Sequence, residues 1–441
     1  MKPTALILFL LLSAPAHAQD GLTVTGSVRL RYETITGQAR SGFNTSDQLL
    51  NLRTILGGEY RTGDLRIGAE LFDSRVYGEN PGTPVTTNEV NTAELVQAYV
   101  AYEQPGAFGS GTSMAVQAGR FTLNLGSRRL VAADDYRNTT NGYTGVRADL
   151  GLGGGTSATL IYTLPQVRLP GDRAALANNR VRFDRESFDL VLWGGIISKK
   201  LGRSGAAAEL SFFHLGERDR PDGQSRDRSL ETLALRMVRE PSVGTIDFDS
   251  ETIYQFGTIS SGLAATAPTL DVSAWAAHAE LGYTLRRPWS PRIALEFDYA
   301  SGDGRGRRFG RFDTLFGMRR AELAPAGLYN SVGRANVLAP GIRVEATPNK
   351  RFDIFAAWKP LWLASRYDSF STTGVRDPTG QSGRFAGHQI EARLRYWLVP
   401  KRLRLEWNGL LLAKGEFLRR APNAPDPRDT RYMSFNAVVS F

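Results

Sequence analysis

The chain has 441 residues, no cysteine, and 54 Lys and Arg against 44 Asp and Glu, a formal net charge of +10. The lack of cysteine excludes disulfide bonds and thiolate chemistry. Glycine (46 residues) and the aromatic residues (7 Trp, 15 Tyr and 22 Phe) are abundant. This composition favours strands and turns over helices, so it predicts an all-β protein.

The N-terminus has the pattern of a secretory signal peptide. Lys2 precedes an apolar run over 5–12, and the triplet 16–18 reads Ala-His-Ala. We therefore expect residues 1–18 to be removed on export. No later stretch approaches the ~20 apolar residues of a membrane-spanning helix, so a helical membrane protein is excluded. Export also argues against nucleic acid as the partner of the positive charge, and leaves anionic solutes or lipid headgroups.

Residues 19–441 contain about eighteen segments in which apolar and polar residues alternate, as in strands with one apolar face. In chain order they are 22–34, 47–61, 64–75, 91–104, 112–122, 142–150, 155–164, 186–199, 205–214, 229–239, 243–257, 271–285, 291–300, 338–347, 351–364, 385–398, 401–416 and 430–441. The alternation is irregular in 112–122 and 186–199, where we expect β-bulges. No linker-like break divides these segments, so a single domain is predicted.

The last segment is the clearest. Met433, Phe435 and Phe441 fall on one face of a strand, and Ser434 and Asn436 on the other. A strand that ends the chain on an aromatic residue resembles the assembly signal of bacterial outer-membrane β-barrels, which makes the barrel-assembly machinery an expected partner. Taken alone, the segment also fits a soluble β-sandwich.

The connections between segments favour the barrel. Links after even segments are short, as at 62–63 and 348–349, whereas links after odd segments are long and polar, as at 165–185. Transmembrane barrels have short periplasmic turns and longer outer loops, and a sandwich has no reason for this asymmetry. We therefore predict a transmembrane antiparallel β-barrel in the outer membrane of a Gram-negative bacterium, in contact with lipid and lipopolysaccharide.

Aromatic residues near the segment ends lie on the same strand face as the apolar residues. This is the position of the aromatic girdles at the two membrane interfaces of such a barrel. These aromatic residues are Tyr60, Tyr283, Tyr299, Trp358, Trp362, Tyr396 and Trp407. Ordinary core aromatics are the alternative interpretation. The opposite face of the strands is charged along much of its length. A barrel of about eighteen strands leaves an aqueous lumen, where these charges stay hydrated.

Several motifs carry a resemblance to a known family. They are Gly119-Arg120, Leu-Asn-Leu-Gly-Ser at 123–127, Arg129-Leu130, Phe-Asp-Tyr-Ala-Ser-Gly-Asp at 297–303, Phe316-Gly317, 348–358 with Trp362, 397–400 and 403–417. Over roughly residues 110–441, the chain resembles the alginate export porin family. The resemblance implies an eighteen-stranded barrel with an electropositive pore that passes an acidic polysaccharide, an alginate-like polyuronate. Arg120 and Arg129 are its best matched positions. A periplasmic export scaffold is a further candidate partner.

The candidate substrate-contacting residues are lumen-parity or motif arginines: Arg29, Arg31, Arg53, Arg66, Arg120, Arg129, Arg147, Arg343, Arg393, Arg395, Arg402 and Arg404. An opposing acidic wall is predicted from Asp247, Asp249, Glu251, Glu280, Glu296 and Asp298. Closure places the last segment beside the first, so arginines from both ends of the chain share one wall. Guanidinium groups bind carboxylates in bidentate fashion. Because each contact is weak in water, the polymer can be released and move through the pore. Alternatively, these arginines pair with neighbouring glutamates and brace the barrel.

Two links are expected to do more than connect strands. The link 128–140 holds a cluster of charges, and we expect it to fold inward and narrow the pore. The link 301–334 holds Arg305, Arg307, Arg308, Arg311, Arg319 and Arg320 among phenylalanines. It can plug the lumen, meet polymer outside, bind lipopolysaccharide phosphates or stay solvated.

Other function classes have less support. His214, His278 and His388 lie on three different segments, and the sequence has no nucleophile elbow, Walker loop or His-x-x-x-His pair. No enzyme activity, metal or cofactor is therefore predicted. The main alternative is an anion-preferring diffusion porin for small acidic solutes, and a barrel with no open pore is another.

Overall fold

The computed structural model describes residues 20–134, 136–202, 205–220, 223–318, 322–323, 325 and 327–441. Within these ranges the chain forms one sheet of 18 strands. The strands are β1 (Gly21–Thr36), β2 (Ser46–Thr62), β3 (Leu65–Tyr77), β4 (Asn91–Pro105), β5 (Ser113–Phe121), β6 (Tyr143–Gly153), β7 (Thr156–Pro165), β8 (Leu190–Leu201), β9 (Ala206–Glu217), β10 (Ser229–Arg239), β11 (Ile246–Ser260), β12 (Thr269–Thr284), β13 (Arg292–Ala300), β14 (Val337–Asn349), β15 (Phe352–Trp362), β16 (Phe385–Val399), β17 (Leu403–Lys414) and β18 (Thr430–Ser440). The proposed signal peptide, 1–18, lies outside the described residues, as do Arg319 and Arg320.

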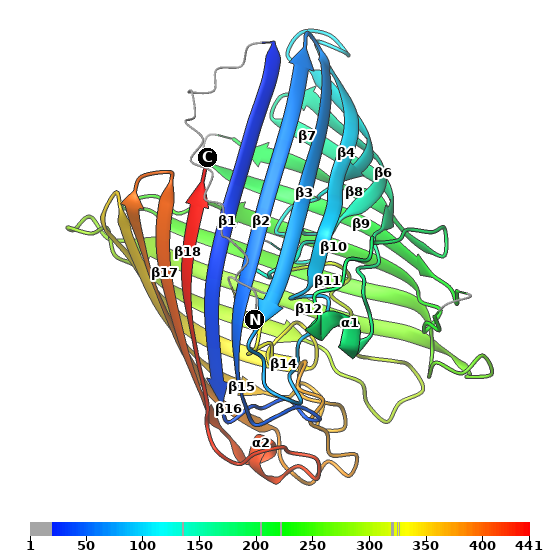
Figure 1. The fold of residues 1–441 in the computed structure, drawn as a ribbon, viewed down its shortest axis with the longest axis vertical. Coiled ribbons are helices and arrows are strands. Elements are labelled where there is room, and N and C mark those ends of the chain that lie inside the picture. The colour runs from blue at the N-terminus through cyan, green and yellow to red at the C-terminus, as the bar shows by residue number, and fades with distance from the viewer. Residues whose placement is uncertain are drawn as a thin grey trace, which may run out of the picture.

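The sheet closes on itself. β1 pairs antiparallel with β2 on one side and with β18 on the other, and the second pairing runs from Ser27 opposite Ser440 to Thr36 opposite Arg431. Each strand pairs with its neighbours in sequence, so the topology is a continuous meander (Figure 1). The prediction of a closed antiparallel β-barrel of about eighteen strands is confirmed.

The two faces of the wall have the polarity of a membrane barrel. On β1 the apolar side chains of Leu30 and Tyr32 are 46% and 42% exposed, whereas Arg29 and Arg31 are 4% and 2% exposed. Apolar residues therefore point outward and charged residues point inward, the reverse of a soluble protein. β18 repeats the pattern, with Phe435 exposed on the outside.

The links alternate in length as predicted. Short turns at one end of the barrel are 63–64, 106–112, 154–155, 202–205, 240–245, 285–291, 350–351 and 400–402. The links at the other end are 37–45, 78–90, 122–142, 166–189, 218–228, 261–268, 301–336, 363–384 and 415–429. Most of these are longer, and we call the two ends the short-turn end and the long-loop end.

Two short helices lie in the long links. They are α1 (Arg173–Ala177) and α2 (Glu416–Arg420), and α2 marks the long-loop end at the bottom of Figure 1. None of the described helices has both the length and the hydropathy needed to cross a membrane.

The bulges expected in 112–122 and 186–199 are not where the sheet is irregular. β5 and β8 pair with their neighbours without a register shift. Shifts occur in the pairs β3–β4, β6–β7, β14–β15, β15–β16 and β16–β17. The parity of the two segments is irregular for another reason. Their apolar residues Phe121 and Leu192 are buried in an apolar cluster inside the barrel, so both faces carry apolar side chains.

Gly119 allows a close approach of β5 to β4. Its φ is +121°, and a Cβ there would stand 2.3 Å from the carbonyl oxygen of Ala98. We expect Gly119→Ala to destabilise the barrel by about 1–3 kcal/mol, because strain adds to the clash. Urea unfolding of the purified protein measures this. In the control, Gly58→Ala, the nearest atom of another strand is 3.9 Å from the new Cβ, and equal stability of the two variants would contradict the prediction.

Candidate functional site

The link 122–142 enters the barrel and attaches to its inner wall. The side-chain amide of Asn138 donates to the carbonyl oxygens of Glu89 (2.8 Å) and Arg75 (3.2 Å). From the wall, Arg29 donates to the carbonyl of Arg137 at 2.6 Å, and Arg31 donates to that of Tyr136 at 2.6 Å. The predicted inward fold of 128–140 is thus confirmed, with Asp135 outside the described residues.

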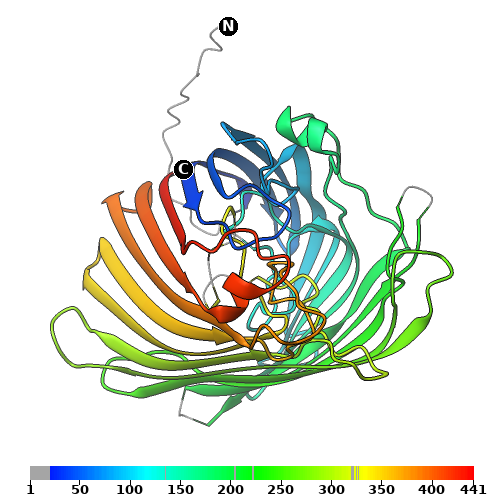
Figure 2. The same cartoon turned by 90° about the horizontal axis from the view of Figure 1, so that it is seen from below.

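The link 301–336 meets the first link inside the barrel. The backbone NH of Phe316 donates to the carbonyl of Leu130 at 3.0 Å, and that of Met318 donates to the carbonyl of Arg128 at 3.0 Å. Val131 and Phe316 form a parallel bridge. We call the described residues of 122–142 and 301–336 together the plug. Figure 2, seen from the long-loop end, shows loop segments within the outline of the ring.

The second half of the plug also contacts the wall. The NH of Leu328 donates to the Glu33 carboxylate on β1 at 2.9 Å. Tyr329 donates to the Gln389 side chain on β16 at 2.7 Å, and Gln389 donates to the carbonyl of Leu323 at 2.6 Å. The plug thus bridges strands from both ends of the chain. By contrast, Arg305, Arg307 and Arg308 are exposed, so the link 301–336 has a buried inner part and an exposed outer part.

An apolar core fills part of the barrel. Leu123, Phe312, Val332, Phe370 and Phe417 are fully or almost fully buried in one cluster, although four different long links supply them. Burying each such side chain contributes about 1.5–3 kcal/mol. The predicted aqueous lumen is therefore partly filled near the long-loop end, where apolar loop residues pack together.

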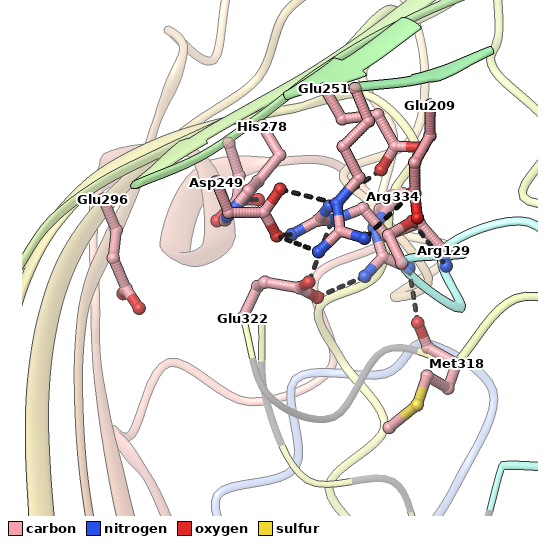
Figure 3. A network of polar contacts seen from close by, with 12 residues as sticks. Arg129, Glu209, Asp249, Glu251, His278, Glu296, Met318, Glu322 and Arg334 are labelled. Atoms are coloured by element: carbon pink, nitrogen blue, oxygen red, sulfur yellow. Dashed lines mark hydrogen bonds and ion pairs between the residues drawn. The ribbon is translucent and has the colours of Figure 1, made fainter. Parts of the chain in front are cut away.

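A network of ion pairs joins the plug to the wall (Figure 3). The guanidinium group of plug residue Arg129 lies 2.9 Å from Asp249, 2.7 Å from Glu251 and 2.9 Å from Glu322. Glu322 also pairs with Arg334. Burial favours a raised pKa for the Glu322 carboxyl, but Arg334 and Arg129 outweigh it and hold the pKa below its ordinary value.

The acidic wall is compensated by cations. Its six residues, Asp247, Asp249, Glu251, Glu280, Glu296 and Asp298, are each paired with a basic side chain. Besides Arg129, the partners are Arg236, Arg292, Lys359 and His278. The carboxylates are therefore held in ion pairs and do not form an open acidic surface. Sequence reasoning missed Arg236, Arg292 and Lys359, although alternation along their strands could have placed them on the inner face.

The basic wall follows from the strand register across the closure. Arg31 lies opposite Asn436 and donates to its side chain at 2.6 Å, while Arg29 lies directly opposite Arg53. On the other side of the closure, Arg404 lies opposite Trp397, and its guanidinium stands 5.6 Å from the ring centre. The wall therefore places like charges side by side.

Arg393 and Arg395 continue this wall on β16. They share one carboxylate, that of Asp353, at 2.8 and 2.9 Å. Arg343 on β14 pairs with Glu345 at 2.6 Å, and its guanidinium lies over the Phe355 ring.

The remaining predicted arginines are dispersed. Arg66 pairs with Glu59 and Glu103, Arg120 with Glu94 and Glu186, and Arg147 with Asp149. These contacts fit the alternative in which arginines brace the wall. Arg402 lies outside β17, exposed in the turn 400–402, because the strand begins two residues later than the predicted segment.

The three histidines do not come together. His214 pairs with Glu231 at 3.1 Å, His278 pairs with Asp298 at 2.8 Å, and His388 is exposed on the outer face. In the part of the chain that the structure describes, no group of three His, Asp or Glu residues is placed to hold a metal ion.

The fold is that of the outer-membrane porins. A BenF-like porin from Pseudomonas fluorescens Pf-5 is similar with a TM-score of 0.59 and 10% identity, over 95% of this chain and 98% of that one. OccK2 (OpdF) from Pseudomonas aeruginosa is similar with a TM-score of 0.58 and 12% identity, over 96% and 100%. At such low identity the likeness shows the fold alone.

The sequence places the chain more narrowly. A model of the alginate export family matches residues 21–430, and the chain belongs to this family. The match begins far upstream of residue 110, where the resemblance in motifs starts. No protein of curated function matches the chain. The protein is therefore an outer-membrane channel of a Gram-negative bacterium, of a family and fold that are those of channels and not of enzymes. The short-turn end is the periplasmic end and the long-loop end is extracellular.

Gly317 is where the two halves of the plug touch most closely. A Cβ there would stand 1.8 Å from the carbonyl oxygen of Arg129. We expect Gly317→Ala to separate 128–132 from 316–318 and to raise the single-channel conductance in planar bilayers. Gly306→Ala is the control on the same link, because a Cβ there meets nothing within 4 Å. Conductance that is unchanged in both variants would show that this contact does not restrict the channel.

Proposed function

We propose that the protein passes acidic saccharides across the outer membrane, and that its substrate is a polyuronate of the alginate type. The observation that carries this proposal is the basic wall on β16, β17, β1 and β2. Its inward-facing arginines are Arg29, Arg31, Arg53, Arg393, Arg395 and Arg404. Arg29 and Arg31 are buried against the plug, whereas the other four are half-buried on the inner face. The positive charge of these neighbouring guanidinium groups attracts carboxylates toward the inside of the barrel.

Neighbouring carboxylates neutralise part of the charge of this wall. Arg31 pairs with Glu33 at 3.3 Å, and Arg393 and Arg395 both pair with the carboxylate of Asp353. Within the described residues, Arg404 has no carboxylate in ion-pair contact, and its guanidinium lies near the Trp397 ring. A partly neutralised guanidinium binds a passing carboxylate weakly enough to release it, as permeation requires.

A solved structure with a similar fold supports the choice of ligand chemistry. Pseudomonas aeruginosa OccK2 (OpdF) has been crystallised in complex with glucuronate, which is a sugar acid. Its likeness to this chain is a TM-score of 0.57 at 12% identity. The family to which this chain belongs is named for alginate export, and alginate is a polymer of uronates.

A second candidate function is diffusion of small acidic solutes. The plug favours it, because the buried apolar cluster and the ion pairs of Arg129 occupy space that a polymer chain needs. A small solute needs less free space beside the plug than a polymer chain does.

Further partners follow from the location in the membrane. The outer face contacts lipid, and the exposed Arg305, Arg307 and Arg308 are candidates for lipopolysaccharide phosphates. The barrel-assembly machinery and a periplasmic export scaffold are also proposed partners. Crosslinking and co-purification from native membranes test all of these contacts.

Replacing Arg404 tests the role of the basic wall. We expect Arg404→Gln to lower the preference for anions several-fold in planar-bilayer recordings under a salt gradient, because one half-buried positive charge on the inner face of the barrel is lost. The matched control is Arg351→Gln in the exposed turn 350–351, where the same charge is removed outside the lumen. A cation-selective wild-type channel, or equal losses in both variants, contradicts the proposal.

Liposome swelling separates the two substrate classes. We expect glucuronate and short mannuronate oligomers to enter proteoliposomes faster than glucose or neutral oligosaccharides of equal length. Entry of the monomer without the oligomers would favour the small-solute porin. Equal rates for acidic and neutral sugars would contradict both.

A further inference from the structure

A second cluster of arginines lies at the extracellular mouth, apart from the basic wall. The links 218–228, 261–268 and 301–336 enclose a pocket of about 460 Å³ there. Its lining includes Arg226, Arg228, Leu263, Phe309, Arg311 and Asp313. The volume lies within the range of small-ligand sites, about 300–1,000 Å³.

The pocket lies at the long-loop end of the barrel. Its lining comes from the ends of β9 and β11 and from described residues of three long links, and it includes the buried Phe312 and Ala335 of the link 301–336. The pocket is therefore at the extracellular end of the channel.

Two of the three arginines that line the pocket form ion pairs with carboxylates of the protein. Arg228 forms two hydrogen bonds of 2.8 Å with the Glu217 carboxylate and one of 2.7 Å with Asp313. Arg311 donates to Asp368 at 2.7 Å and to the carbonyl of Ser369 at 3.0 Å. These two side chains hold the walls of the pocket in place.

Arg226 differs from both. Its Nε donates to the carbonyl of Ser260 at 2.8 Å, and its guanidinium lies 4.8 Å from the centre of the Phe309 ring. No described carboxylate forms an ion pair with it. Burial, and next the charge of Arg228, lower its pKa below the ordinary value, but an arginine remains charged at neutral pH. Arg226 thus presents a charged, oriented donor to the pocket.

The other lining groups suit a sugar ring. Leu263 and Phe309 offer an apolar surface for the C–H face of a pyranose, and the carboxylates of Glu217 and Asp313 offer acceptors for hydroxyl groups. Their negative charge disfavours a ligand with several dense charges such as a phosphate cluster. A saccharide that bears one carboxylate per ring has the sugar ring that fits these groups and does not carry dense negative charge.

We propose that this pocket is a binding site for a uronate residue of an acidic saccharide at the extracellular mouth, with Arg226 as the ligand of its carboxylate. The choice of a uronate rests on the proposed function. The site itself is separate from the basic wall, more than one strand pair away, so the two can be tested apart.

The test measures binding of glucuronate and dimannuronate to the full-length protein in detergent by titration calorimetry and saturation-transfer NMR. We expect Arg226→Gln to weaken binding at this site about tenfold, or about 1.4 kcal/mol, because a charge-assisted hydrogen bond to the carboxylate is lost. The control is Arg218→Gln, an exposed arginine on the same link that does not line the pocket. Leu263→Glu, on an exposed link, is a second variant that repels a carboxylate without removing Arg226.

The outcomes separate this site from the function of the lumen. Binding unchanged in Arg226→Gln and Leu263→Glu overturns the pocket, even if Arg404→Gln lowers anion selectivity and the channel function stands. Binding lost in both pocket variants, with selectivity unaffected by Arg404→Gln, supports the pocket and contradicts the basic wall. Inorganic phosphate that competes better than glucuronate would assign the pocket to phosphate groups and overturn the uronate site.

Discussion

The pairing of β1 with β18 is the constraint on which the rest depends. In a bilayer each unpaired backbone group costs several kcal/mol, so a sheet can span it only when its first and last strands meet. The register of this pairing, Ser27 opposite Ser440, also sets which side chains become neighbours inside. It brings Arg29 and Arg31 beside strands that lie 400 residues away in the sequence, and so creates the basic wall.

Closure leaves an interior that the protein then partly fills. The plug is held by three kinds of contact: backbone hydrogen bonds at Phe316 and Met318, a buried apolar cluster, and the ion pairs of Arg129. The same ion pairs help to neutralise Asp249 and Glu251 on β11. Both walls contact the plug. The acidic wall does so through ion pairs with Arg129, and the wall across β16 to β2 does so through hydrogen bonds such as those from Arg29 and Arg31.

Much of the fold could be predicted from the sequence, because the alternation of Leu30 with Arg29 and Arg31 reports which face meets lipid. The lengths of the links then indicated which end of the barrel is periplasmic and which is extracellular. The contacts of the plug could not be predicted. The fit of Gly317 against the carbonyl of Arg129 depends on two links that approach only after closure. The pairing of Asp247 with Arg292 depends on the register of strands between them, which alternation alone does not define.

Whether the plug must move depends on the size of the substrate. Moving the plug would expose Phe312 and Leu123 to water and separate Arg129 from Asp249 and Glu251 on β11. Asp249 would keep its ion pair with Arg236, whereas Glu251 would lose its ion pair with Arg129. Breaking a buried ion pair by removing one partner costs about 3–5 kcal/mol. The proposed passage of a monomeric acid along the basic wall does not require this displacement. A polyuronate needs it, and must offset the cost with carboxylates that replace those released from the arginines.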